Sequence, residues 1–246
     1  MNSFNHHPVL SVIISALNEE ARVEAILRQV LEIFKKYDID GELIFLNNHS
    51  ADRTGDIAAA LAKTEPRLKV IQRYNRSSKD LGSSLKEGIK NAAGNFFLIM
   101  DCDLSHNPED IRQLFDSREK ADIIIGSRFV KGGSATLSSQ RRFLSRFYNV
   151  FARVLTGLPV NDLTTGFKLY RLKKVTDIKI ENNGFGFHVE LPIKAYFRGA
   201  TFLEIPIHYE KSPKESTLRY HKQFFSYMNP VFWGFLQRIK HIFSVF

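Results

Sequence analysis

Two carboxylates, Asp101 and Asp103, flank the chain's single cysteine directly after an apolar run at residues 96–100. That run is apolar enough to form a central buried strand. Carboxylates at this spacing past a strand end can bind Mg²⁺ or Mn²⁺ while phosphate oxygens of a ligand fill other coordination positions. An isolated Asp-x-Asp is equally consistent with a cap on the following helix, so the motif needs support from the rest of the chain.

Basic residues gather later in the chain, where no acidic residue accompanies them. Residues 123–161 contain six basic side chains: Arg128, Lys131, Arg141, Arg142, Arg146 and Arg153. Arg141, Ser145 and Arg146 stand at the start of a helical apolar stripe. The stripe consists of Phe147, Phe151, Val154, Leu155 and Leu158. Because arginine suits bidentate contacts with phosphate, this segment favours an anion site over a solvated helix face.

The elements that would position these residues alternate between short strands and longer helices. Strands are predicted at residues 10–16, 42–47, 68–72, 96–100 and 122–126. Helices are predicted at residues 19–37, 54–63, 83–93 and 108–117. This alternation is typical of an α/β fold with a mainly parallel central sheet flanked by helices. In such sheets ligands bind at the carboxyl ends of the strands.

Polar residues follow the predicted strands and are expected to meet on one rim. Ala16, Asn18 and Glu19 end or follow the first strand, and Asn48 and Asp52 follow the second. Gly82, at a predicted helix start, would offer backbone amides to a phosphate, although a plain turn explains it equally well. No P-loop or Gly-x-Gly-x-x-Gly motif occurs, so phosphate binding would depend on a metal and on basic side chains.

The composition limits the classes of protein to consider. With 246 residues, 43% of them apolar and 25% charged, the chain can bury a full core. A single cysteine excludes an intrachain disulfide and a cysteine-based zinc site. No secretory signal or membrane-spanning segment is evident. The formal net charge of +9 predicts a polyanionic partner, but nucleic acid is not expected because no nucleic-acid-binding motif accompanies the charge.

The chain is expected to form one catalytic domain at residues 1–225 and an amphipathic helix at residues 226–246. After Pro230, apolar residues recur at helical spacing, with Arg238, Lys240 and His241 between them. An aromatic, basic helix of this kind suits a membrane interface. It is equally consistent with a terminal helix docked on the core of the domain.

Taken together, these residues resemble those of family 2 glycosyltransferases, and most closely the dolichol-phosphate mannose synthase group. The resemblance runs from about Ser11 to about Tyr220. It is carried by six ordered motifs, at residues 11–19, 100–109, 126–133, 162–170, 187–190 and 204–207.

The resemblance implies a GT-A fold, which is the Rossmann-like fold of nucleotide-diphospho-sugar transferases. It implies an inverting transferase that moves a sugar, with mannose from GDP-mannose favoured, to a polyprenyl (dolichyl-type) phosphate. The metal, Mg²⁺ or Mn²⁺, would be held by Asp101, Asp103 and Ser105. Asp101, Asp103 and Arg128 are the expected catalytic residues.

Two further groups of residues are expected at the substrates. The donor is expected near Ala16, Asn18, Glu19, Asn48, Asp52 and Gly82. The acceptor phosphate is expected near Arg128, Arg141 and Ser145. The enzyme would work peripherally at the cytoplasmic face of a membrane, and a separate membrane-anchoring partner is a further expectation.

The chain also departs from the family pattern. Asn47 and Asn48 stand where a pair of acids is usual, Cys102 replaces a usual alanine, and His188 replaces a common glutamine. The pattern at residues 211–219 is altered as well. Open alternatives are a UDP-glucose-dependent polyprenyl-phosphate glucosyltransferase, a transferase with a non-lipid glycan or protein acceptor, an inactive sugar-binding homologue and a basic nucleic-acid-binding protein.

Overall fold

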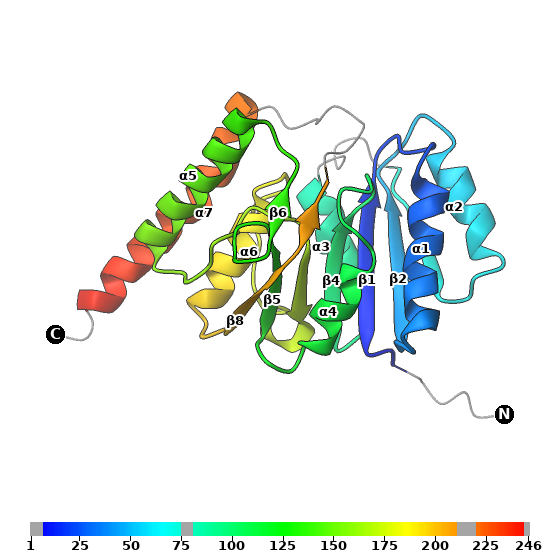
Figure 1. The fold of residues 1–246 in the computed structure, drawn as a ribbon, viewed down its shortest axis with the longest axis horizontal. Coiled ribbons are helices and arrows are strands. Elements are labelled where there is room, and N and C mark those ends of the chain that lie inside the picture. Colours follow the sequence, from blue (N-terminus) through cyan, green and yellow to red (C-terminus); the bar gives the residue numbers. More distant parts are fainter. Residues whose placement is uncertain (1–6, 75–80, 211–219, 244–246) are drawn as a thin grey trace.

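A computed structural model describes residues 7–74, 81–210 and 220–243, which fold around a seven-stranded sheet (Figure 1). The strand order is β3-β2-β1-β4-β7-β5-β8. The strands are β1 (Leu10–Ala16), β2 (Gly41–Asn47), β3 (Leu68–Gln72), β4 (Phe96–Asp101), β5 (Ile123–Ser127), β7 (Lys168–Arg171) and β8 (Phe202–Pro206). Two short strands, β6 (Ser134–Ala135) and β9 (His208–Tyr209), pair separately.

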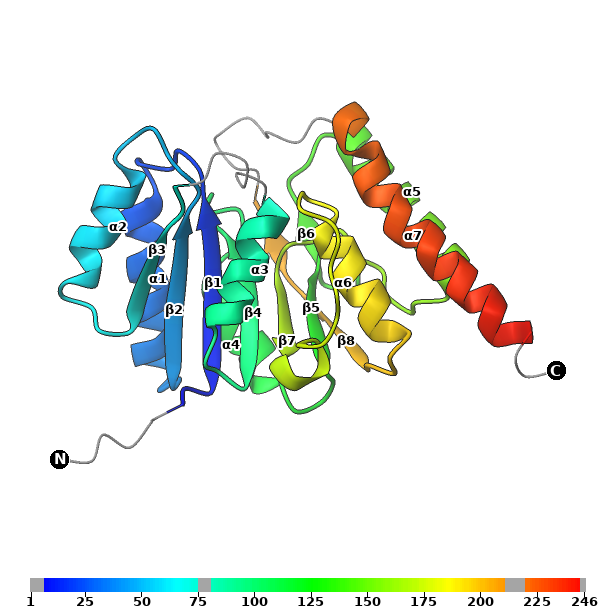
Figure 2. The same cartoon turned by 180° about the vertical axis from the view of Figure 1, so that it is seen from behind.

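Helices cover both faces of the sheet, which is why its central strands read as continuous apolar runs (Figures 1 and 2). The helices are α1 (Val23–Lys36), α2 (Thr54–Ala62), α3 (Leu81–Asn91), α4 (Asp110–Asp116), α5 (Ser139–Thr156), α6 (Phe187–Tyr196) and α7 (Tyr220–Phe243). One buried cluster joins the sheet to α1, α2 and α4. A second cluster joins the opposite face to α3 and α6 and to the inner sides of α5 and α7.

Strand β7 is the exception in an otherwise parallel sheet. It lies between β4 and β5 and runs antiparallel to both, with Lys168 opposite Ile99 and Ile125. Because of this direction, the loop that precedes β7 lies at the same edge of the sheet as the carboxyl ends of β4 and β5. The mainly parallel sheet predicted from the sequence is confirmed, while β7 itself was not predicted.

The loops at this edge contain unusual backbone conformations. Asn18, His49 and Leu104 have φ angles of 56°, 57° and 60°, and they follow β1, β2 and β4 respectively. Residues other than glycine rarely adopt this left-handed backbone conformation, which costs about 1–3 kcal/mol of conformational free energy per residue. Asp38, between α1 and β2, has a φ of 50° as well, so three of the four such residues in the described ranges lie in loops of the predicted rim.

Helices α5 and α7 lie side by side at one end of the sheet (Figures 1 and 2). The Tyr148 hydroxyl of α5 donates to the Tyr227 carbonyl of α7 at 2.7 Å. Arg238 of α7 donates to the Val154 carbonyl near the carboxyl end of α5. Close packing continues at Gly234, where an added Cβ would lie 2.8 Å from side-chain atoms of Thr156 and Ile193. Helix α7 is therefore docked on the domain.

The predicted elements differ from the observed ones mainly at their ends. The helix predicted from residue 19 begins at Val23, because the Glu19 amide donates to the Thr54 hydroxyl and its loop continues to Arg22. The helix predicted from residue 226 begins at Tyr220 and continues through Pro230. The five strands predicted at residues 10–126 are confirmed to within one residue at each end.

Candidate active site

The two carboxylates of the Asp-x-Asp motif lie at the carboxyl end of β4. Asp101 is the last residue of that strand, and Asp103 lies in the loop that follows. One oxygen of the Asp103 carboxylate accepts a hydrogen bond from the Ser105 amide at 3.0 Å. The Ser105 hydroxyl is buried and has no hydrogen-bond partner in the described part of the chain. The loop thus presents two carboxylates and an unpaired hydroxyl.

The electrostatics of this loop favour a cation. Burial, and then the negative charge of Asp103, raise the pKa of Asp101 to about 7, although the Arg128 and Lys168 charges oppose this effect. His106, whose Nδ1 atom is 3.8 Å from a carboxylate oxygen of Asp101, supplies no charge. Burial lowers the pKa of His106 to about 4, which keeps the ring neutral. A divalent cation would supply the missing positive charge.

Arg128, at the end of β5, is held by a buried carboxylate. Its Nε and Nη2 atoms donate to the two carboxylate oxygens of Asp162 at 2.7 Å each. The Asp162 side chain is completely buried and that of Arg128 is 10% exposed. A bidentate contact between Arg128 and a substrate phosphate was expected, but the structure gives that contact to Asp162. Within the described residues, Nη1 is the one guanidinium nitrogen of Arg128 that makes no hydrogen bond. It is therefore available to a substrate.

Ser145, on α5, lies beside Arg128 through a shared contact. Nη2 of Arg128 donates to the Thr164 hydroxyl at 3.0 Å, and the Ser145 hydroxyl is 3.3 Å from the same oxygen. Arg141 is half-buried in the first turn of α5, which is capped by Ser138. The structure therefore brings two of the three predicted acceptor residues together and places the third on the same helix.

The loop between Asp162 and β7 connects this arginine cluster to the carboxylates. At Gly166, an added Cβ would lie 3.3 Å from both carboxylate oxygens of Asp101, so the loop passes directly against that side chain. The acidic and basic parts of the predicted site are thus adjacent, and Gly166 permits the close approach.

The completely buried Lys168 holds this loop in place. Its ammonium group donates to the carbonyl oxygens of Leu163, Thr165 and His188. These contacts satisfy its three donors and join the loop to α6. Burial lowers the pKa of Lys168 to about 7, against the opposing attraction of Asp162.

The predicted donor residues meet where the loops after β1 and β2 cross. The Asn48 amide donates to the Ala16 carbonyl at 2.9 Å, and the Ala51 amide donates to the Asn18 side chain at 2.8 Å. Glu19 lies in the same loop and pairs with Arg22 at 3.0 Å. The structure therefore brings Ala16, Asn18, Glu19 and Asn48 together at one end of the rim.

Asp52 braces these two loops. Its carboxylate accepts hydrogen bonds from the amides of Thr54 and Glu20 at 3.0 and 3.2 Å. Although burial alone would raise the pKa of Asp52, the hydrogen bonds from Thr54 and Glu20 lower it. The side chain thus has a structural task, and its contact with a donor stays a prediction.

Gly82 has a packing explanation in this structure. A Cβ at this position would lie 2.8 Å from backbone atoms of Asn182, Asn183 and Gly184, and the Ser83 amide donates to the Asn183 carbonyl. The start of α3 is therefore covered by this backbone, which supports the turn interpretation over a phosphate cradle. A donor contact at Gly82 is not needed to explain the glycine.

The asparagines after β2 are engaged by other polar side chains. Asn47 donates to Gln72 at 2.7 Å, while Asn48 donates to Ser15 and accepts from buried Arg73 at 2.7 Å. The neutral amide of Asn48 thus faces a guanidinium where an acid is usual in the family. The altered segment at residues 211–219 lies outside the described residues.

The part of the chain that forms most of this site matches a known protein family. The model of the family described as "Glycosyl transferase family 2" matches residues 11–178, which include both loops of the donor end, the carboxylates, Arg128 and Ser145. This chain belongs to glycosyl transferase family 2. The transferase therefore places its characteristic motifs on the rim derived above.

Three relatives of the transferase have names that combine a polyprenol lipid with mannose. It is 30% identical over 176 residues to the undecaprenyl-phosphate mannosyltransferase of Micrococcus luteus, covering 68% of this chain and 71% of that protein. It is 31% identical to the polyprenol monophosphomannose synthase of Mycolicibacterium smegmatis, covering 80% of this chain and 75% of that protein. It is 31% identical to the dolichol-phosphate mannosyltransferase of Pyrococcus furiosus, covering 91% of this chain but 62% of that protein.

Solved structures show that the transferase has a GT-A fold. Glucosyl-3-phosphoglycerate synthase from Mycobacterium tuberculosis, crystallised with Mn²⁺, UDP and glucosyl-3-phosphoglycerate, superposes with a TM-score of 0.68 at 18% identity. The match covers 94% of this chain and 80% of that one. The same synthase with phosphoglyceric acid gives a TM-score of 0.71 at 18% identity, over 92% of this chain and 80% of that one.

The donor set of the transferase fits a hard divalent cation. Asp101, Asp103 and the unpaired Ser105 hydroxyl offer oxygen atoms, which Mg²⁺ and Mn²⁺ prefer. No cluster of three or more histidine, cysteine or acidic residues able to hold a metal occurs in the described ranges. Water or donor phosphate oxygens would complete the coordination around these three residues.

Some residues at the site of the transferase were not predicted individually. Asp162 and Thr164 position Arg128, although their motif was recognised as a whole in the sequence. Phe129 contacts two arginines, with its ring centroid 5.1 Å from Cζ of Arg128 and 5.3 Å from Cζ of Arg146. Both residues belong to segments that the sequence analysis singled out, the motif at residues 126–133 and the cluster of arginines. Sequence spacing alone does not show that Phe129 and Arg146 are in contact.

Proposed function

We propose that this transferase moves a sugar from a nucleotide sugar to a polyprenyl phosphate with inversion, and that GDP-mannose is its preferred donor. The observation that carries the proposal is the position of the Arg128–Thr164–Ser145 cluster, which the loop at Gly166 connects to Asp101 at the end of β4. A cation site and an anion site side by side suit a donor diphosphate and an acceptor phosphate. The names of the three relatives support the lipid class and the mannosyl group.

The reaction needs little proton chemistry from the protein. An oxygen of the acceptor phosphate, already ionised near neutral pH, attacks the anomeric carbon while the bond from that carbon to the nucleotide diphosphate breaks. Nη1 of Arg128 and the Ser145 hydroxyl orient the attacking phosphate. A divalent cation on Asp101, Asp103 and Ser105 would stabilise the charge that grows on the leaving diphosphate.

A lipid acceptor lies in a membrane, so the enzyme must act at a membrane surface. We propose that the enzyme acts peripherally at the cytoplasmic face of a membrane, with or without a separate anchoring partner. In the described ranges, no helix combines the length and apolar character needed to cross a bilayer.

A panel of donors and acceptors tests the proposed reaction. GDP-mannose, UDP-glucose and other radiolabelled nucleotide sugars are incubated with the full chain, Mg²⁺ or Mn²⁺, and undecaprenyl or dolichyl phosphate. We expect solvent-extractable label from GDP-mannose that requires both the divalent cation and the polyprenyl phosphate. Label from UDP-glucose instead would replace the donor, while label only on a glycan or protein would refute the lipid acceptor.

Ser145→Ala tests the acceptor cluster. Loss of a hydrogen bond to a charged phosphate costs about 1.5–3 kcal/mol, so we expect the KM for polyprenyl phosphate to rise by about tenfold or more. The KM for the nucleotide sugar serves as the internal control and should stay the same. An unchanged acceptor KM would remove Ser145 from the acceptor site.

A further inference from the structure

We infer that the outward faces of α5 and α7 together form the surface on which this transferase docks on an anionic lipid bilayer. The described chain has thirteen exposed large apolar residues, and eleven of them belong to these two helices. They are Phe143, Leu144, Phe147, Val150, Val154, Phe224, Phe225, Phe232, Leu236, Ile242 and Phe243. Soluble monomers rarely leave apolar side chains concentrated in this way, so a partner is indicated.

The spacing of these residues places them on the sides of the helices that face away from the domain. Phe143, Phe147, Val150 and Val154 recur at intervals of three or four residues along α5. The inner side of α5 is occupied instead by buried Ala152. The stripe predicted from the sequence shares Phe147 and Val154 with this one, whereas Leu158 of that prediction is completely buried.

Helix α7 repeats the arrangement. Phe225, Phe232, Leu236 and Phe243 are separated by seven, four and seven residues and therefore share one side of the helix. Val231, which is completely buried, belongs to the side that packs on the domain. Each helix is thus covered on one side by protein and left apolar on the other.

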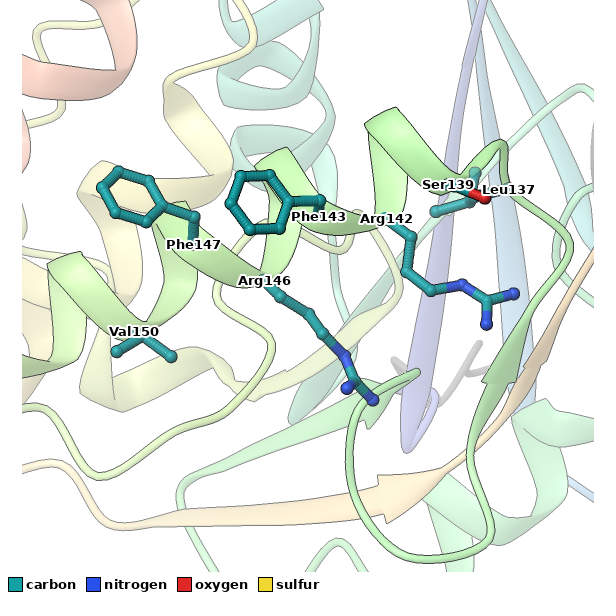
Figure 3. Close-up of a pocket in the computed structure, with 7 residues that line it drawn as sticks. All are labelled: Leu137, Ser139, Arg142, Phe143, Arg146, Phe147 and Val150. Carbon is teal, nitrogen blue, oxygen red and sulfur yellow. The ribbon is translucent and has the colours of Figure 1, made fainter.

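The charges of the two helices identify a lipid surface as the occupant. Neither helix contains an acidic residue. Arg142 and Arg146 line a pocket of about 470 Å³ on α5 together with Phe143, Phe147 and Val150 (Figure 3). Figure 3 shows the two arginines extending from one side of α5 and the two phenylalanines from another. Cations beside aromatic rings suit lipid phosphates above acyl chains.

A second copy of the chain fits this surface less well. A symmetric contact through α5 and α7 would place basic helices against basic helices, with no acidic residue on either to offset the repulsion. A bilayer with anionic lipids offers the opposite charge and an apolar interior in the same surface.

Docking through α5 would bring the acceptor cluster to the bilayer. This step of the inference rests on the proposed lipid acceptor. Ser145 of the acceptor cluster is on α5, and Arg146 contacts the ring of Phe129, which Arg128 contacts as well. Docking through α5 would therefore hold the acceptor cluster close to the depth of the lipid headgroups. The polyprenyl phosphate would then reach Arg128 with its chain still in the bilayer.

Cosedimentation of the full chain with vesicles tests the surface without any acceptor present. We expect binding to phosphatidylcholine vesicles that contain phosphatidylglycerol, weaker binding to phosphatidylcholine alone, and weakening by salt. F143S/F147S and F232S/L236S should each lower the partition coefficient by about tenfold or more, since about 1.4 kcal/mol corresponds to tenfold. Tyr74→Ser, at a residue that is 77% exposed and away from both helices, is the control and should bind normally.

Circular dichroism of each variant confirms its fold, because all the substituted side chains are exposed. Absence of binding to the anionic vesicles, or unchanged binding by both double variants, would overturn the inference. So would a stable dimer in analytical ultracentrifugation that F143S/F147S dissociates. Sugar transfer to a water-soluble short-chain isoprenyl phosphate should be retained by F143S/F147S. If the unaltered chain binds vesicles as expected but transfers no sugar, the proposed function fails and the docking surface stands.

Discussion

Asp103→Asn is expected to lower the turnover number by about two to three orders of magnitude, the range seen when a preorganised electrostatic contact to developing charge is removed. Asparagine retains the oxygen that accepts the Ser105 amide, so the loop can keep its shape while losing one anionic ligand. Asp101 would then be the one carboxylate left on the metal loop. Steady-state kinetics with titrated Mn²⁺ measures the loss, and calorimetry measures the accompanying fall in metal affinity.

Asp116→Asn is the matched control for this variant. Asp116 belongs to α4, its side chain is 61% exposed, and it pairs with Arg112 on the same helix. Its replacement should leave both turnover and metal affinity unchanged. Full activity in Asp103→Asn, or in the unaltered chain after treatment with a chelator, would contradict the assignment of the carboxylates.

The second large effect concerns stability. Asp162→Asn is expected to lower the free energy of unfolding by about 3–5 kcal/mol, because it leaves the Arg128 guanidinium buried without its charged partner. Urea denaturation followed by circular dichroism measures the change. Asp116→Asn again serves as the control, since its exposed ion pair contributes little and stability should hardly change.

The same pair predicts a pH dependence of stability. Burial alone would raise the pKa of Asp162, but the charge and hydrogen bonds of Arg128 hold it below its ordinary value. The contribution of the pair is therefore complete above the unfolded carboxyl pKa of about 3.9 and is lost as the pH falls through the lower folded value. Asp162→Asn should lack this part of the acid transition, and an identical acid transition in both proteins would contradict the role of the pair.

Much of the fold could be predicted because its central strands are locally distinct. Strands β1, β2 and β4 are runs of apolar residues buried on both faces, and each is followed by polar residues. Strand β7 could not be predicted in the same way. Its four residues begin with a buried lysine, and their place in the sheet depends on pairing with two strands distant in the sequence.

The site shows the same division between local and distant information. The carboxylates and Ser145 could be proposed from motifs, since their chemistry depends on residue type and on the ends of elements. The fork of Arg128 was assigned to a phosphate, yet it contacts Asp162, which is 34 residues away in the sequence. The stripe predicted at residues 147–158 combines exposed Phe147 and Val154 with buried Leu158, because only packing shows which side of the helix the domain covers.

The order of strands in the sheet also constrains how the chain can be shortened. Strand β5, with Ile123, Ile124 and Ile125 completely buried, pairs with β7 and β8, which both come later in the sequence. A fragment that ends before Lys168 would leave both edges of this isoleucine strand unpaired. Unpaired strand edges recruit strands from other molecules. Such a fragment is therefore expected to aggregate, and a shortened form of this enzyme must keep β7 and β8.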